Sequence, residues 1–175
     1  MAFSTIIKPS DYFNTKLYTG NGSTNAITGV GFQPDFTWIK QRAGATSHML
    51  FDVIRGATYR LSSDTNEANG QYSTSLTAFG SDGFTLGSFN DVNINSGTFA
   101  AWNWKANGAG SANTQGSINS TVSVNTTSGF SIVKYSGNSS STSTIGHGLG
   151  VAPSLVIIKN LGQAEEWVVG VNAGS

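Results

Sequence analysis

The sequence predicts an all-β protein built as an antiparallel β-sandwich, and three observations support this fold class. Short runs rich in β-branched and aromatic residues alternate with clusters of Gly, Asn, Ser and Asp, which is typical of strands joined by turns. No long stretch keeps the i, i+3, i+4, i+7 apolar spacing of an amphipathic helix. Hydrophobic residues make up 38% of the 175 residues, so the chain can bury a core although only 10% of its residues are charged.

The expected strands follow one another along the whole chain, with turn segments such as GNGST and SDG between them. They lie near residues 15–19, 35–41, 47–54, 57–62, 71–79, 83–87, 98–105, 117–124, 130–136, 154–160 and 165–171. The run TFAAWNWKA places Trp102 and Trp104 on one face of its strand and Asn103 on the other. DFTWIK and LVIIK are apolar at both parities, which predicts strands buried on both sides. Many short strands with this spacing favour a sandwich.

The chain contains an internal repeat. GFQPDFTWIK at residues 31–40 matches GVAPSLVIIK at 150–159, and residues 4–21 lie over 121–138 without a gap. A two-residue insertion separates the two matches. Gly-x-x-Pro before an apolar run ends one element and begins a core strand, because Pro fixes φ and cannot donate to a central ladder. The repeat therefore predicts two copies of one β-unit.

The two copies are unequal in length. We expect residues 1–106 to form the first sandwich unit, 107–116 a linker rich in Gly, Ser and Asn, and 117–175 an incomplete second copy. The second copy has no counterpart of residues 57–105, so it would expose open strand edges and an uncovered apolar face. We therefore expect that the chain is a fragment of a longer protein or that another chain covers the second unit. The expected repeat core includes Trp38, Ile39, Ile157 and Ile158, and Trp167 lies in a repeated core strand.

Composition excludes several classes of protein. Nine Lys and Arg balance nine Asp and Glu, so the chain has no electrostatic attraction to nucleic acid or to acidic membranes. It contains no Cys, which excludes disulfides and thiolate sites. The N-terminal MAFSTIIKPSDYF has no basic n-region and no long apolar h-region, so we expect no signal peptide. No apolar run approaches the ~20 residues of a membrane span, so membrane insertion is not expected.

The sequence offers little catalytic or metal-binding chemistry. His48 and His147 are the only histidines, and no G-x-S-x-G motif leads into a helix. Hydrolysis of glycans normally needs a carboxylate pair, and the nine acids form no clear pair. The segment SSDTNEANG lacks the spacing of an EF-hand loop. We expect no enzymatic activity, no cofactor and no metal.

Aromatic and charged residues suggest binding or structural roles. Trp102 and Trp104 are candidates for stacking on sugar rings, and burial in the core is the alternative that we favour because exposed Trp pairs are uncommon outside binding surfaces. Asp52 and Arg55 lie three residues apart in FDVIRG. They form either a surface ion pair of little energetic value or a buried pair that fixes a turn.

Several motifs together are similar to a known family. IIKPSDYFNTKLYTGNGS, ITGVGFQPDFTWIKQR, HMLFDVIRGATYRLSS, SDGFTLGS, AAWNWKANG and the later GFSIVKYSGNSSSTSTIGHGLGVAPSLVIIKN resemble a tandem-repeat domain of virion structural proteins of marine tailed phages, of the cyanophage and pelagiphage type. The resemblance covers nearly the whole chain. It implies a lectin-like β-sandwich of jelly-roll type and a location in the virion, and it carries no catalytic residues.

Three functional classes are consistent with these observations. The first is a tail-fibre or appendage segment that serves assembly and host-surface attachment, the second a capsid decoration protein of the same fold, and the third a carbohydrate-binding module. We expect a particle-surface protein made in the host cytoplasm, with other virion proteins as partners, a host-surface glycan as ligand, and a homotrimer or another closed homo-oligomer. The candidate assembly contact is the N-terminal segment with Phe3, Ile6, Ile7 and Tyr12.

Overall fold

The computed structural model describes residues 6–172, and almost all of its regular structure is β. The first part contains η1 (Pro9–Asp11), β1 (Phe13–Thr19), β2 (Asn25–Ile27), β3 (Phe36–Gln41), β4 (Met49–Asp52), β5 (Tyr59–Ser62), β6 (Gly70–Gln71), β7 (Leu76–Gly80), β8 (Gly83–Leu86), α1 (Asn90–Asn93) and β9 (Thr98–Trp104). The second part contains β10 (Ser111–Asn113), β11 (Ser120–Asn125), β12 (Phe130–Tyr135), β13 (Leu155–Ile158) and β14 (Val168–Val171). No helix within residues 6–172 is long and apolar enough to cross a membrane.

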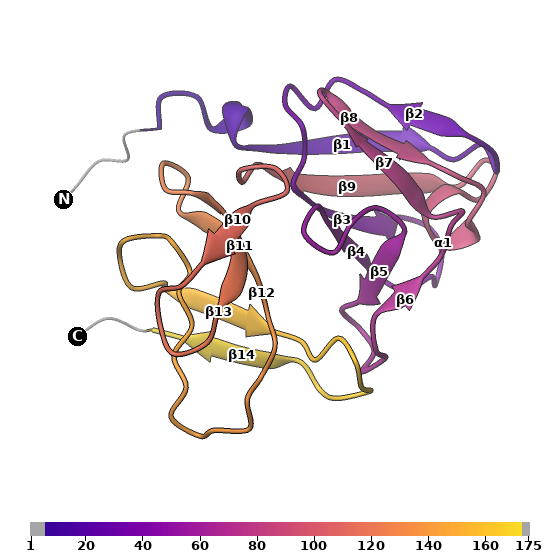
Figure 1. Cartoon of the computed structure of the whole chain (residues 1–175). Helices are drawn as coiled ribbons and strands as arrows, with labels where there is room; N and C mark the ends of the chain where they lie inside the picture. Colours follow the sequence, from indigo (N-terminus) through magenta and orange to yellow (C-terminus); the bar gives the residue numbers. More distant parts are fainter. Residues whose placement is uncertain (1–5, 173–175) are drawn as a thin grey trace.

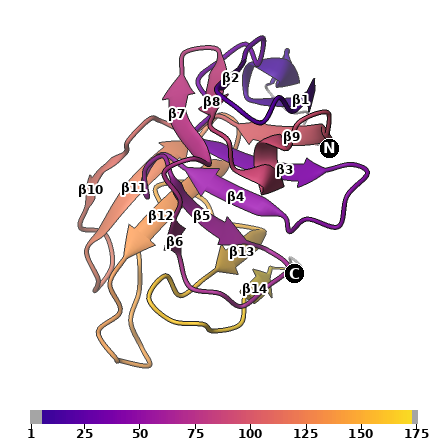
Figure 2. The ribbon, with the colours of Figure 1, turned by 90° about the vertical axis from the view of Figure 1, so that its right-hand side faces the viewer.

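The first part is a sandwich of two antiparallel sheets, which confirms the predicted fold class (Figures 1 and 2). One sheet has six strands in the order β1-β9-β3-β4-β5-β6, and the other has three in the order β2-β8-β7. The strand β9 lies between β1 and β3 and pairs with both along most of its length. The last strand of the unit therefore joins the edge strand β1 to the rest of the large sheet.

A continuous apolar core fills the space between the two sheets. Tyr18 stacks on Phe99 with ring centroids 5.0 Å apart, and its hydroxyl donates a hydrogen bond of 2.6 Å to the Val92 carbonyl oxygen. Burial raises the pKa of Tyr18 well above its ordinary value, so the hydroxyl keeps the proton that it donates. Each large side chain buried here contributes ~1.5–3 kcal/mol. The fully buried cluster consists of Ile27, Ile39, Met49, Phe51, Leu76, Phe84, Leu86, Val92, Phe99 and Ala101.

The opposite face of the six-stranded sheet carries rows of large side chains. Trp102 and Trp104 share one face, as the alternation along β9 predicts. That face is the outer one, where both are half-buried, so the favoured burial of the pair in the core is wrong, and Phe99 and Ala101 point into the core instead. The cross-strand register arranges the outer residues in two rows across the sheet. These rows are Thr15–Trp102–Trp38–Leu50 and Phe13–Trp104–Phe36–Asp52.

Asp52 and Arg55 form a buried ion pair at the end of β4, which decides between the two interpretations of the sequence. Only 8% of the Asp52 side chain and 6% of the Arg55 side chain are exposed. The Arg55 Nε donates to the Asp52 carboxylate, and the Asp52 carboxylate also accepts the backbone N–H of Arg55 at 2.8 Å. The Arg55 guanidinium further donates to the carbonyl oxygens of Leu50 and Tyr59 and to Asn69 Oδ1. The pair therefore fixes the turn between β4 and β5.

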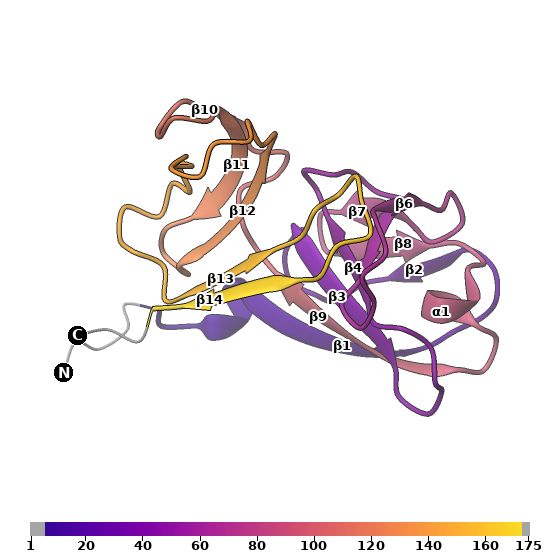
Figure 3. The same ribbon diagram turned by 90° about the horizontal axis from the view of Figure 1, so that it is seen from below.

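The second part of the chain forms a three-stranded sheet, β10-β11-β12, and a separate hairpin, β13–β14 (Figure 3). Residues 107–116, which the composition predicts to be a linker, include β10, and β10 pairs with β11. Part of the predicted linker is therefore an edge strand of this sheet.

The hairpin β13–β14 repeats the hairpin β3–β4 at a constant offset of 119 residues, and the pairing register is the same in both. The pairs of the first hairpin are Phe36–Asp52, Thr37–Phe51, Trp38–Leu50 and Ile39–Met49. The corresponding pairs of the second are Leu155–Val171, Val156–Gly170, Ile157–Val169 and Ile158–Val168.

Hydrogen bonds outside the ladders match at the same offset. Lys40 Nζ donates to the Gly44 carbonyl oxygen at 3.0 Å, and Lys159 Nζ donates to the corresponding Gln163 carbonyl oxygen at 3.3 Å. The backbone bonds from Val53 N to Asp35 O and from Asn172 N to Ser154 O are 3.0 and 2.9 Å long. The two hairpins thus share their pairing register and these matched hydrogen bonds.

The expected burial of the repeat core is wrong for the second hairpin. Ile39 is fully buried, and Trp38 lies half-buried on the outer face. Ile157 and Ile158 are 54% and 38% exposed because no strand of residues 6–172 packs over them. Trp167 is half-buried, and its Nε1 donates to the carbonyl oxygens of Ser62 and Thr65 of the first unit, so it anchors the second hairpin instead of filling a core.

Asp82 in the turn between β7 and β8 holds the loop that precedes β3. Its carboxylate accepts the backbone N–H groups of Gly31 at 2.7 Å and Gly29 at 2.9 Å, and both glycines have positive φ. These two hydrogen bonds, with a smaller contribution from the Lys16 charge, lower the pKa of Asp82. The exposed carboxylate therefore links the β7–β8 turn of the small sheet to the loop that leads into β3 of the large sheet.

We expect Asp52→Ala to destabilise the fold by ~3–5 kcal/mol, because the substitution leaves the Arg55 charge buried without its partner. Urea unfolding followed by tryptophan fluorescence measures the change in the free energy of unfolding. Asp11→Ala is the matched control, since Asp11 also pairs with a cation three residues away but the Lys8–Asp11 pair is exposed. Its expected cost is below ~1 kcal/mol. Equal costs for the two variants would contradict this role of the buried pair.

The lowered pKa of Asp82 predicts a pH-dependent contribution to stability. A carboxyl whose pKa is lower in the folded state stabilises the fold above its unfolded pKa of ~3.9 and loses that contribution as pH falls through the folded pKa. The difference in free energy of unfolding between the wild type and Asp82→Asn should therefore be largest near neutral pH and vanish in acid. A carbon-detected NMR titration should place the Asp82 pKa below that of a model peptide. A difference that is independent of pH would contradict the prediction.

Candidate functional site

A shallow groove of about 580 Å³ lies on the outer face of the six-stranded sheet. It is formed where β3 ends, by the loop that follows β3 and by the neighbouring part of β9. Lining residues come from these three segments and are mostly polar or aromatic. They are Lys40, Gln41, Arg42, Gly44, Ala100 and Trp102.

Trp102 forms the aromatic wall of the groove and is held by its neighbours. It is half-buried and meets Trp38 edge to face with ring centroids 6.2 Å apart. Trp38 is fixed in turn, because its Nε1 donates a hydrogen bond of 2.9 Å to His48 Nδ1. The backbone N–H of His48 donates to Asp64 at 3.0 Å. The indole of Trp102 is therefore a preorganised flat surface on a rigid strand.

The loop wall of the groove is also fixed. Lys40 Nζ donates to the carbonyl oxygens of Gly44 and Thr46 at 3.0 and 2.7 Å, so the ammonium is occupied by the loop. The Gln41 amide lies over Gly44, where an added Cβ would come within 2.1 Å of Gln41 Oε1. Arg42 is exposed, and its guanidinium has no hydrogen bond or ion pair within residues 6–172. The groove thus offers an aromatic ring, an amide and an available cation.

This combination suits a sugar that carries an acidic group. An indole face packs on the C–H face of a pyranose, an amide bonds to hydroxyls, and a guanidinium binds a carboxylate in a bidentate manner. The sequence names Trp102 as a candidate stacking residue, although burial in the core is the favoured alternative there, and it does not identify Gln41 and Arg42 as neighbours of Trp102. Their only sequence signal is the QR dipeptide directly after a core strand, and sequence spacing alone does not place it beside Trp102.

Trp104, the second predicted stacking residue, does not reach the groove. Its ring lies 4.8 Å from Phe13, 5.4 Å from Phe36 and 6.1 Å from Phe130 of the second unit, measured between ring centroids. Aromatic contacts of this kind contribute ~0.5–1.5 kcal/mol each beyond the burial of area. Trp104 therefore joins the two units, and the structure assigns the two tryptophans to different surroundings.

The structure describes three of the four residues of the predicted assembly contact at the N-terminus. Phe3 lies outside the described residues. Ile7 is fully exposed, Ile6 is half-buried, and the half-buried Tyr12 accepts the backbone N–H of Lys105 through its carbonyl oxygen at 2.8 Å. The exposed Ile7 precedes η1 by two residues and remains a candidate contact.

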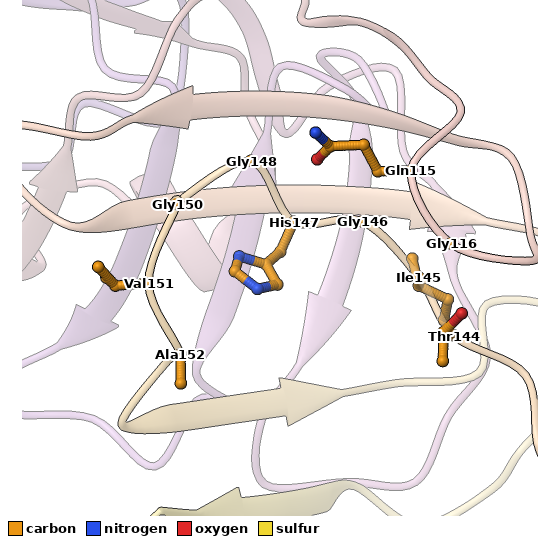
Figure 4. A pocket seen from close by; sticks show the side chains of 10 residues that line it. All are labelled: Gln115, Gly116, Thr144, Ile145, Gly146, His147, Gly148, Gly150, Val151 and Ala152. Carbon is orange, nitrogen blue, oxygen red and sulfur yellow. The ribbon is translucent and has the colours of Figure 1, made fainter.

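A second hollow of about 390 Å³ lies beside the glycine-rich loop of the second unit (Figure 4). His147 is the one ionisable side chain among its lining residues. Its Nδ1 accepts the backbone N–H of Leu149 at 3.2 Å, and its carbonyl oxygen accepts the Ser131 hydroxyl at 2.6 Å. The contacts hold the loop against β12 and bring no acid or nucleophile to the imidazole.

The polar segment between β5 and β6 is occupied by contacts within the protein. Asp64 accepts the His48 N–H, Glu67 pairs with Arg60 at 3.3 Å, and Asn69 Oδ1 accepts from Arg55 at 3.0 Å. Asn66 Nδ2 donates to Glu166 at 3.4 Å. Among the described residues no three His, Cys, Asp or Glu side chains gather as metal ligands.

Comparisons with known proteins place the chain in a family without adding a described activity. No curated protein and no solved structure shows a significant match. The match to a family covers all but the ends of the chain, well over half of its length. The chain belongs to the family described as Domain of unknown function (DUF7483), which matches residues 8–173.

Proposed function

We propose that this protein is a phage virion structural protein, a segment of a tail fibre or another appendage that serves assembly and host-surface attachment. The location in a virion rests on the sequence motifs that resemble domains of tailed-phage structural proteins. The role in assembly is carried by one observation, the exposed apolar hairpin β13–β14. Both strands of this hairpin carry exposed Leu, Ile or Val side chains. A contiguous exposed apolar patch is typical of a surface that binds another protein.

The proposed role is structural and does not involve catalysis. Nδ1 of His48 accepts the Trp38 indole N–H, and Nδ1 of His147 accepts a backbone N–H. The buried acid Asp52 is paired with Arg55. These groups serve the fold, so their arrangement supports an assembly protein better than a hydrolase.

The groove beside Trp102 supports a second function, binding of a host-surface glycan. This function is compatible with the first, because a fibre must both assemble and attach. The available Arg42 guanidinium favours glycans that carry a carboxylate, such as uronic acids.

Purified particles of the phage that encodes this chain test the main proposal. We expect the chain in the particles by mass spectrometry, and three-fold density that fits the β-sandwich at the tail in cryo-electron microscopy. Density on the capsid shell in many copies would assign the protein to the decoration class instead. Absence of the chain from intact particles would contradict both versions.

Glycan binding is tested on an array that contains neutral and uronate-bearing oligosaccharides. We expect Trp102→Ala to weaken binding about tenfold or more, since the loss of stacking and burial removes ~1.4 kcal/mol or more. Arg42→Gln should weaken binding of the uronate-bearing glycans alone. Trp104→Phe is the matched control because it keeps an aromatic ring outside the groove. Equal binding by the wild type and Trp102→Ala would contradict a site at this groove.

A further inference from the structure

The hairpin β13–β14 exposes a face whose counterpart in the first unit is completely buried. We call Val156, Ile158 and Val168 the core-equivalent face, since they correspond to Thr37, Ile39 and Met49. The three residues of this face are 41%, 38% and 59% exposed. Their counterparts are 0%, 0% and 1% exposed. The backbone pairing is the same in both hairpins, so the difference lies in what packs on them.

The first unit shows which elements cover this face. The strand β9 pairs with the outer edge of β3 and sets Ala101 opposite Ile39. The sheet β2-β8-β7 then packs over the face, with Leu76, Phe84 and Leu86 in the same buried cluster as Ile39 and Met49. The strand β5 pairs with the outer edge of β4. All of these elements except β2 lie within residues 57–105.

The second hairpin has none of these partners in the described chain. Within residues 6–172, β13 and β14 pair only with each other, so both outer edges carry unpaired backbone groups. Exposed apolar edges of this kind favour the addition of another strand. Both strands are free of charged side chains, so the surface selects a neutral partner.

We propose that β13–β14 is the docking surface for a polypeptide that carries the counterpart of residues 57–105. A neutral strand with the pattern of β9, TFAAWNW, would pair with the outer edge of β13. An apolar hairpin with the pattern of β7–β8 would cover the core-equivalent face. This inference rests on the two hairpins themselves and does not depend on the proposed virion role.

The surface is held in place before any partner binds. Trp167 Nε1 donates to the carbonyl oxygens of Ser62 and Thr65, both at 3.0 Å. Lys159 Nζ donates to the Asn66 carbonyl oxygen at 3.2 Å, and Asn69 N donates to the Leu161 carbonyl oxygen at 3.0 Å. The loop between β13 and β14 is therefore fixed to the first unit (Figure 3). Such preorganisation lowers the entropic cost of docking.

Hydrogen exchange of the full chain with a synthetic β9 peptide tests the proposal. The probe is GTFAAWNWKA, the sequence of residues 97–106. We expect it to slow amide exchange in β13 about tenfold or more at saturation, because strand addition protects the edge amides. A peptide of the same composition in scrambled order should leave the exchange unchanged. A lack of protection by the β9 peptide would count against the proposal.

Two substitutions in β13 separate the faces of the hairpin, one at Ile158, which is 38% exposed, and one at Leu155, which is 56% exposed. Ile158→Asn changes the core-equivalent face and should reduce the protection to about twofold or less. Leu155→Asn changes the opposite face of the same strand and should retain it. Equal effects of the two variants would overturn the assignment of the face.

A chain extended by a copy of residues 57–105 tests the same surface without depending on the affinity of a free peptide. Ser175 corresponds to Gly56 at the 119-residue offset, so residues 57–105 can be appended directly after Ser175 in register. We expect slowed exchange in β13 and β14 of this extended chain and its loss with Ile158→Asn. Protection that appears in the original chain alone, rises with protein concentration and accompanies a dimer in light scattering would identify a second copy as the occupant. That result, or an extended chain without protection, would overturn the proposal.

Discussion

The pairing of β9 with both β1 and β3 is the interaction on which the rest of the first unit depends. It pairs residues that are 79 to 91 positions apart in the case of β1 and 58 to 68 positions apart in the case of β3, and it places Phe99 and Ala101 in the core. The same strand presents Trp102 to the groove and Trp104 to the contact with the second unit. One strand therefore completes the sheet, fills the core and positions both outer tryptophans.

The second hairpin shows what the same backbone does without such a strand. Its register and the hydrogen bond from its loop lysine match those of β3–β4, because hairpin pairing and the carbonyl groups of the loop act locally. Its apolar side chains remain exposed, because burial requires elements from elsewhere. The pairing register of the hairpin therefore follows from local sequence, whereas the burial of its side chains depends on the elements that pack over it.

The surfaces proposed for attachment and for assembly are built on different parts of the protein. The groove lies on the rigid outer face of the large sheet, where Trp38 and His48 hold Trp102 in place. The docking surface lies on the second unit, which contacts the first through Phe130 and through Trp167. The two surfaces share no residue and lie on different units of the chain.

The sequence by itself determined the fold class, most of the strands, the repeat and that Trp102 and Trp104 share a face, because alternation, turn residues and self-similarity are local properties. It limited Asp52 and Arg55 to two interpretations. Only the tertiary structure decided that this pair is buried, that Ile157 and Ile158 are exposed, that residues 107–116 contain a strand, and that Gln41 and Arg42 lie beside Trp102 but not Trp104. Each of these depends on contacts between residues distant in sequence, and the periodicity of a strand records which face a residue is on but not what covers that face.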